Sequence, residues 1–104
     1  MKAYMLTLSG QGDTYVKFID QEAWDWMHLV DRDYKAPLPK GIEEKLRLRD
    51  GADYEEPNIT SGSAFNDAAL QCPVIAQFYD VKEAIDYIKA NDVDVIDTFE
   101  GYIY

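Results

Sequence analysis

The sequence predicts an α+β fold with a mixed four-stranded sheet, built from an N-terminal β-hairpin and a C-terminal strand-helix-strand unit, with the helices packed mainly on one face. Two strand-like runs open the chain, and an amphipathic helical pattern lies between two strand-like runs near its end. The chain has 104 residues, of which 47% are hydrophobic, which suits one core. We therefore expect residues 1–104 to form a single domain.

The hairpin is predicted from residues 3–8 and 14–19, which are rich in residues that favour strands. Residues 10–13 between them read Gly-Gln-Gly-Asp, and glycine tolerates the positive φ angles of a tight turn. Asp20 then stands where a helix N-cap belongs, which predicts a helix over 21–30. Apolar residues with helical spacing mark its buried face: Ala23, Trp24, Met27 and Val30.

Residues 31–62 are predicted to be an irregular, loop-rich insertion, because Pro and Gly interrupt every long pattern there. Within this segment, residues 42–49 fit either a short helix that buries Ile42 and Leu46 or an alternating strand. We favour the helix. Another short helix is expected after Ser63, with one apolar face formed by Phe65, Ala68 and Ala69.

The C-terminal third carries the clearest signals. Residues 74–79 are strand-like, and Asp80 with Glu83 forms a capping box at the start of a helix. The apolar face of that helix is expected to consist of Val81, Ala84, Ile85 and Ile88. Residues 93–103 form a last, long strand, which we expect to run parallel to 74–79 because a helix connects the two.

Alternation along the last strand predicts which of its side chains face outward. The core positions are expected to be Val93, Val95, Phe99 and Ile103. The outward positions combine carboxylates and aromatic rings: Asp94, Ile96, Thr98, Glu100, Tyr102 and Tyr104. Strict alternation would put Asp97 on the core face, so either a bulge at Ile96-Asp97 turns it outward, or it is buried with a partner, or it is a functional buried carboxylate. We favour the bulge.

Charge is the strongest functional signal in the sequence. Twenty acidic residues stand against ten basic ones, which gives a net charge of -10. Residues 1–49 hold eight acids and eight bases, whereas residues 50–104 hold twelve acids and two bases. A surface of this sign repels phosphate backbones and anionic membranes and attracts basic proteins. We therefore expect a basic protein partner and neither direct nucleic-acid binding nor membrane binding.

The candidate partner-binding residues are carboxylates and aromatic anchors: Asp92, Asp94, Glu100, Tyr102, Tyr104, Asp86, Glu83 and Trp26. Tyrosine and tryptophan supply rigid contact area at interfaces. Trp24 and Trp26 project about 200° apart on a helix, so one can be core while the other is partly exposed. We hypothesise a non-catalytic acidic inhibitor that blocks the basic nucleic-acid-binding surface of a partner protein or nuclease, as a phage anti-defence nucleic-acid mimic or a nuclease-toxin immunity protein.

Two alternatives stay open. One is a small enzyme or ligand-binding domain with its site near Asp97, His28 and Cys72. The other is a structural subunit that forms a homodimer by pairing its last strand with that of a second copy. One cysteine and one histidine are too few for a structural zinc site, residues 92–97 fail the calcium-loop pattern, and no phosphate-binding loop is present. We expect no catalytic residue, no metal and no cofactor.

The sequence also carries signals about location. A single cysteine cannot close an intramolecular disulfide, which fits a reducing compartment. The first residues lack the apolar region and cleavage site of a signal peptide, and no run approaches the ~20 apolar residues of a membrane span. We expect a soluble, cytoplasmic protein.

Overall fold

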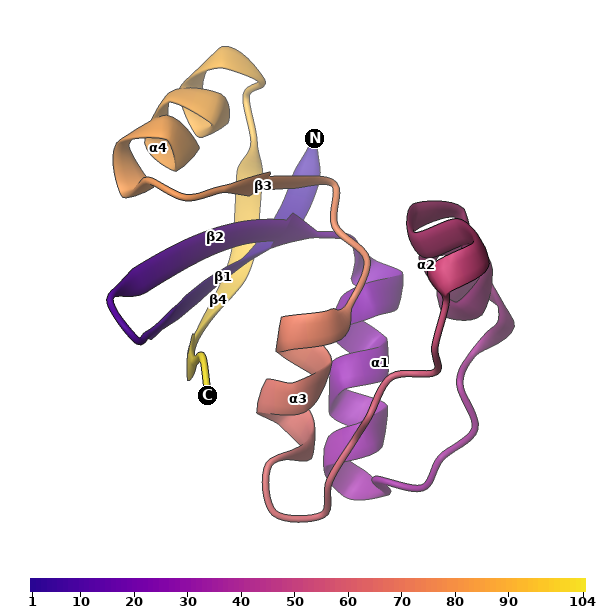
Figure 1. The fold of residues 1–104 in the computed structure, drawn as a ribbon. Coiled ribbons are helices and arrows are strands. Elements are labelled where there is room, and N and C mark those ends of the chain that lie inside the picture. The colour runs from indigo at the N-terminus through magenta and orange to yellow at the C-terminus, as the bar shows by residue number, and fades with distance from the viewer. The chain divides into compact units, whose positions relative to one another are not determined.

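The computed structural model describes residues 1–104 and has an α+β fold (Figure 1). Its elements follow in this order: β1 (Lys2–Gly10), β2 (Asp13–Ile19), α1 (Gln21–Arg32), α2 (Lys40–Asp50), the 3-10 helix η1 (Gly51–Asp53), α3 (Ala64–Gln71), β3 (Ala76–Phe78), α4 (Val81–Ala90) and β4 (Asp94–Tyr102). The predicted fold class, with a hairpin and a C-terminal strand-helix-strand unit in one mixed sheet, is confirmed.

The chain forms two compact units. Unit 1 comprises Met1–Gln21 and Val74–Tyr104 and contains the whole sheet with α4, and unit 2 comprises Glu22–Pro73 and contains the other helices. None of the helices combines the length and the apolar character that crossing a membrane requires.

The sheet of unit 1 has the strand order β3-β2-β1-β4. β1 pairs antiparallel with β2 and parallel with β4, while β2 pairs antiparallel with β3. β3 and β4 therefore run in the same direction at opposite edges of the sheet, as expected for strands joined by a helix. The hairpin turns through Gln11 and Gly12, whose φ angles of 52° and 83° are the pair of positive values that a type I′ turn requires. β3 is shorter than the predicted run over 74–79.

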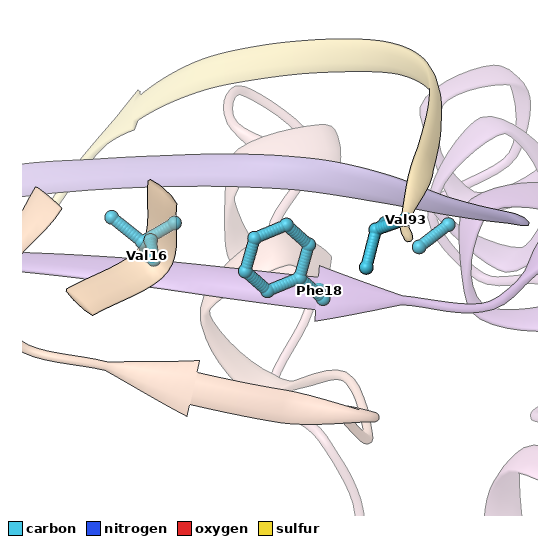
Figure 2. Close-up of a cluster of buried hydrophobic side chains, with 5 residues drawn as sticks. Val16, Phe18 and Val93 are labelled. Carbon is cyan, nitrogen blue, oxygen red and sulfur yellow. The ribbon is translucent and has the colours of Figure 1, made fainter. Parts of the chain in front are cut away.

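α4 packs on one face of the sheet through a small hydrophobic cluster. Its buried members are Ala3, Val16, Phe18, Ala84 and Val93 (Figure 2). The Tyr87 ring of α4 lies 5.1 Å from the Phe18 ring and 5.2 Å from the Phe78 ring, measured between centroids. Aromatic contacts of this kind add to the stabilisation that burial provides. Leu6, Leu8 and Ile19, on the opposite face of the same strands, are fully buried as well.

The ends of α4 are set by local hydrogen bonds. The Asp80 carboxylate accepts a hydrogen bond from the Lys82 backbone N–H at 2.9 Å, so Asp80 is the N-cap that the sequence predicts. At the other end, the Asn91 side chain donates to the Tyr87 carbonyl at 3.0 Å. Asp92 follows with a φ of 49°, a left-handed conformation that ends the helix and leads into β4.

The buried face of α4 differs from the predicted one. Ala84 is buried and Ile88 packs against the cluster, but Val81 is 50% exposed and Ile85 is 44% exposed. The helix is turned so that Tyr87 packs into the cluster. The physical reason is that an aromatic ring removes more apolar surface from water than a valine or isoleucine side chain does.

The predicted bulge in β4 is confirmed. The pairing of β1 with β4 shifts register between Ala3 and Met5, where two residues of β4, Ile96 and Asp97, stand opposite the single Tyr4 of β1. Asp97 is exposed, and its Oδ1 atom accepts a hydrogen bond from the Thr98 backbone N–H at 2.8 Å. The interpretations that bury this carboxylate are therefore wrong.

Unit 2 is organised by α1, α2 and α3. The segment 42–49 is helical, as favoured, and α2 buries Ile42 and Leu46. α2 is joined to α1 by an ion pair in which the Lys45 Nζ lies 3.0 Å from the Glu22 Oε1. The irregular insertion predicted over 31–62 thus contains one regular helix and the short η1.

The loop before α3 is held by the buried carboxylate of Asp67. This side chain accepts hydrogen bonds from the Thr60 backbone N–H at 2.9 Å, from the Thr60 hydroxyl at 2.7 Å and from the Ser63 hydroxyl at 3.3 Å. Ser63 is the N-cap residue of α3, but its hydroxyl bonds to Asp67 rather than capping the helix backbone. A carboxylate with several donors is stable when buried, so Asp67 is structural.

Candidate functional site

The predicted carboxylates and tyrosines are all exposed on unit 1. Glu83 and Asp86 lie on α4, Asp92 lies between α4 and β4, and the others lie on β4 or just after it: Asp94, Glu100, Tyr102 and Tyr104. They occupy one helix and one edge strand of the sheet, which hold them on regular backbone. Sequence reasoning therefore placed them correctly at the surface.

The bulge divides β4 into two parts and overturns the predicted single outward row. Asp94 aligns with Lys2 of β1, whereas Glu100 aligns with Thr7, and these two β1 residues point to opposite faces. Asp94 and Glu100 therefore lie on opposite faces of the sheet. The inserted residue causes this, because one extra position reverses the alternation for every residue that follows.

The core positions predicted for β4 change for the same reason. Val95 lies on the α4 side with Ala3, whereas Phe99 aligns with Leu6 on the other side. Asp94 and Tyr102 are also far apart along the strand, by roughly 25 Å at 3.3 Å per residue. The carboxylates and tyrosines of β4 thus lie at two separate surface sites. The first is around Asp94, and the second is around Glu100 and Tyr102.

The second surface site, around Glu100 and Tyr102, is a hollow on the α4 side of the sheet. The hydrophobic cluster beneath α4 extends along β1 as far as Met5, and the hollow lies beyond it. Thr7 aligns with Glu100 and Ser9 aligns with Tyr102, so four side chains from two paired strands share this face. The hollow has a volume of about 330 Å³ and is lined by Thr7, Ser9, Glu100, Gly101 and Tyr102.

The carboxylates of unit 1 are mostly not neutralised. Between residues 80 and 100, Asp86 forms an ion pair with Lys82 at 3.0 Å on the exposed side of α4. The other six carboxylates of this segment form no ion pair: Asp80, Glu83, Asp92, Asp94, Asp97 and Glu100. The electrostatic potential around α4 and β4 is therefore negative.

The folded protein distributes its charge differently from the linear chain. Unit 1 has nine acids and four bases, and unit 2 has eleven acids and six bases, so each unit has a net charge of -5. The excess that fills the second half of the sequence is thus shared between the two units. Net charge alone does not select the site, and the pairing of the individual carboxylates has to be compared.

Trp26 is not an exposed anchor, contrary to its prediction as a binding residue. It is 2% exposed, because it lies on the buried face of α1 with Ala23, Met27 and Val30. Trp24 is the half-buried tryptophan of the pair. Its ring lies 4.9 Å from the His28 ring and 6.0 Å from the Phe65 ring, between centroids.

The residues of the enzyme alternative have local roles in the structure. The Nδ1 of His28 donates a hydrogen bond to the Trp24 carbonyl at 3.0 Å, and the His28 ring packs against Phe65. Cys72 is fully buried, and its thiol donates to the Ala69 carbonyl at 3.6 Å. A nucleophilic thiol is activated by a neighbouring base, and the contacts of the His28 ring are with Trp24 and Phe65.

The pKa values of Asp50 and Tyr54, both in unit 2, are shifted. The Arg49 guanidinium donates hydrogen bonds to Asp50 at 2.9 and 3.2 Å and lowers the pKa of that carboxyl. Burial raises the pKa of the Tyr54 hydroxyl, whose ring lies 4.3 Å from the Arg47 guanidinium carbon. Both shifts come from structural contacts around α2.

The structure contains no group of three or more histidine, cysteine, aspartate or glutamate side chains that could hold a metal ion.

Sequence reasoning missed Thr7 and Ser9 as candidate site residues. The alternation of β1 puts them on one face with Ala3 and Met5, so their shared orientation is visible in the sequence. Their position beside Glu100 is not, because it depends on β4 pairing with β1.

A second hollow of about 330 Å³ in unit 2 was also missed, and its walls include Trp26, Tyr34, Pro37, Glu56 and Ile59.

The comparisons with known proteins do not identify the chain. No family model matches it, and neither a curated protein nor a solved structure does. The function therefore has to be argued from the geometry and the charge.

Proposed function

We propose that this protein is a non-catalytic inhibitor that binds a basic, nucleic-acid-handling partner protein and covers its positively charged surface. One observation carries the proposal. Six carboxylates between residues 80 and 100 are held at the surface by α4, β4 and their connection without an ion pair. Uncompensated carboxylates on regular backbone repel one another, which lowers stability, and this is the arrangement that a binding surface for cations requires.

The mechanism is electrostatic complementarity. The negative field of α4 and β4 steers a cationic surface toward unit 1 and raises the association rate, an effect that salt weakens. The exposed Tyr102 then adds contact area beside Glu100, because both side chains line the hollow on the α4 side of the sheet. The carboxylates take the positions that phosphates would occupy on the partner, so nucleic acid and inhibitor exclude each other.

Two biological settings share this chemistry. A phage anti-defence protein would cover a host nuclease or DNA-binding protein, and an immunity protein would cover a nuclease toxin. In both, the partner is basic and the complex competes with nucleic acid. The identity of the partner distinguishes the two settings.

Homodimerisation through the outer edge of β4 has less support. The bulge at Ile96 and Asp97 interrupts the edge, and the Asp97 side chain bonds to the backbone N–H of Thr98. Bulges and charged side chains are devices that prevent edge strands from pairing with another copy. The edge thus has features that oppose strand addition.

The experiment compares two variants that lose the same charge in different places. One carries Asp94→Asn, Asp97→Asn and Glu100→Gln in unit 1, and the matched control carries Asp53→Asn, Glu55→Gln and Glu56→Gln in unit 2. The full-length protein is immobilised, proteins retained from the native host at low salt are identified, and the affinity of each for both variants is measured. We expect a nucleic-acid-binding partner whose affinity falls at least about tenfold for the unit 1 variant and little for the control.

Two results would overturn the proposal. The first is that no retained protein binds nucleic acid, or that nucleic acid and this chain do not compete for the retained protein. The second is an equal loss of affinity for the two variants, which would mean that binding follows total charge and not the carboxylates of β4.

A further inference from the structure

The hollow beyond the end of α4 has the composition of a cation-binding site. Its walls provide the Glu100 carboxylate, the Tyr102 ring and the hydroxyls of Thr7 and Ser9. The Tyr102 side chain is 73% exposed, and Glu100 is exposed without an ion pair. No basic residue lines the hollow, so the Glu100 charge is not compensated from within the protein.

The bases of unit 1 lie elsewhere. Lys2 and Lys17 align with residues whose side chains are on the other face of the sheet, and Lys82 is paired with Asp86. Lys89 is in the last turn of α4, at the end that precedes the start of β4, whereas the hollow lies near the other end of that strand. No base of unit 1 is therefore placed to pair with Glu100, and a positive group of another molecule can bind there.

We propose that this hollow receives the guanidinium group of an arginine side chain of the partner protein. This inference rests on the proposed function and names the group that the same surface recognises. A guanidinium is planar and has five N–H donors, so it can form two parallel hydrogen bonds with a carboxylate and stack on an aromatic ring. Its remaining donors match hydroxyl acceptors on the neighbouring strand.

The arrangement of the walls favours arginine over lysine. Paired strands lie about 4.8 Å apart, so the carboxylate of Glu100 on β4 and the hydroxyl of Thr7 on β1 stand side by side and can both face a flat group that lies over the two strands. Tyr102 lies two residues beyond Glu100 on the same face and offers its ring to the group. A lysine ammonium is compact and strongly hydrated, so it stacks on the ring and bonds to the paired acceptors less well than a guanidinium does.

The test uses two blocked peptides of equal length and charge, one with four arginines separated by glycines and one with four lysines in the same positions. Each is titrated into the isotope-labelled full chain at low salt, and backbone amide shifts are followed by NMR. We expect the arginine peptide to bind about three- to fivefold more tightly, with its largest shifts at Thr7, Ser9, Glu100 and Gly101.

Variants assign the preference to the two groups. Glu100→Gln and Tyr102→Leu should each remove most of the preference for arginine, whereas Tyr102→Phe, which keeps the ring, should preserve it. Glu83→Gln removes the same charge from α4 and should leave the preference unchanged. All three positions are exposed, so the spectra of the four free variants should match that of the parent protein away from the substitution.

Equal affinity for the two peptides, or shifts centred away from the hollow, would overturn the arginine site. The proposed function would survive that result if a nucleic-acid-binding partner still lost affinity for the unit 1 variant. Conversely, a clear arginine preference at the hollow combined with a partner that does not bind nucleic acid would support the site and overturn the proposed function.

Discussion

The two compact units have the same net charge of -5 but use their carboxylates differently. In unit 2, bases of α2 form ion pairs within the unit: Lys45 with Glu22, Arg47 with Glu43, and Arg49 with Asp50. In the segment 80–100 of unit 1, six carboxylates have no ion pair and one, Asp86, is paired with Lys82. Equal charge therefore hides a difference in pairing, because three acids of unit 2 hold bases of α2. Exposed acids without an ion pair occur in unit 2 as well, among them Asp53, Glu55 and Glu56.

The units also differ in what stabilises them. Unit 1 is held by strand pairing and by the hydrophobic cluster beneath α4. Unit 2 also buries apolar side chains of its helices, and its loop before α3 is held by hydrogen bonds to the buried Asp67. This difference can be tested by removing one contact of each kind.

The largest effect is expected in the cluster of unit 1. Phe18 is fully buried and contacts the rings of Phe78 and Tyr87, so Phe18→Ala should lower the free energy of unfolding by about 3–5 kcal/mol. Urea unfolding of the full chain measures this change. The control is Ile85→Ala on the exposed side of α4, which should change the free energy by less than about 0.5 kcal/mol. Equal losses would mean that Ile85 belongs to the core after all.

A smaller effect is expected at the polar contact that holds the loop of unit 2. Asp67→Ala leaves the donors of Thr60 and Ser63 without their acceptor and should lower the free energy of unfolding by about 1–3 kcal/mol. Hydrogen exchange should also become faster at the Thr60 amide. Asp53→Ala, an exposed acid of the same unit, serves as the control, and an identical change in both variants would contradict the role assigned to Asp67.

The smallest effect is expected when one carboxylate is neutralised in each unit. The change in the free energy of unfolding should differ in sign between a paired and an unpaired carboxylate. Glu43→Gln breaks the ion pair with Arg47 on α2 and should lower the free energy of unfolding by about 0.3–0.5 kcal/mol. Glu100→Gln should leave it unchanged or raise it slightly, because this carboxylate has no ion pair and is repelled by its neighbours. Chemical unfolding at low ionic strength, repeated at about 1 M salt where charges are screened within ~3 Å, measures the difference. A loss at Glu100 as large as that at Glu43 would remove the contrast between the units.

Local features of the fold were predictable because they depend on neighbouring residues. The turn at Gln11 and Gly12, the N-cap at Asp80 and the helix over α2 follow from backbone preferences and from hydrogen bonds within a few positions. The bulge at Asp97 was predictable as well, because a charged residue at a core position has to be turned outward or paired.

Features that depend on distant residues were predicted less well. The buried face of α4 was misplaced because the Tyr87 ring packs on Phe18 and Phe78, which belong to other strands. Trp26 was wrongly assigned to the surface, because helical spacing allows either tryptophan of α1 to be the buried one. For the candidate site, the sequence identified Glu100 and Tyr102 but not their neighbours Thr7 and Ser9 on β1.

The sequence by itself determined the charge, the elements and the fold class, since composition and local periodicity are properties of the chain at short range. The tertiary structure decided which carboxylates share a face, because one inserted residue in β4 reverses every side chain that follows it. It also decided that Glu100 and Tyr102 meet two hydroxyls across a strand boundary, a result of the pairing register between the two ends of the chain.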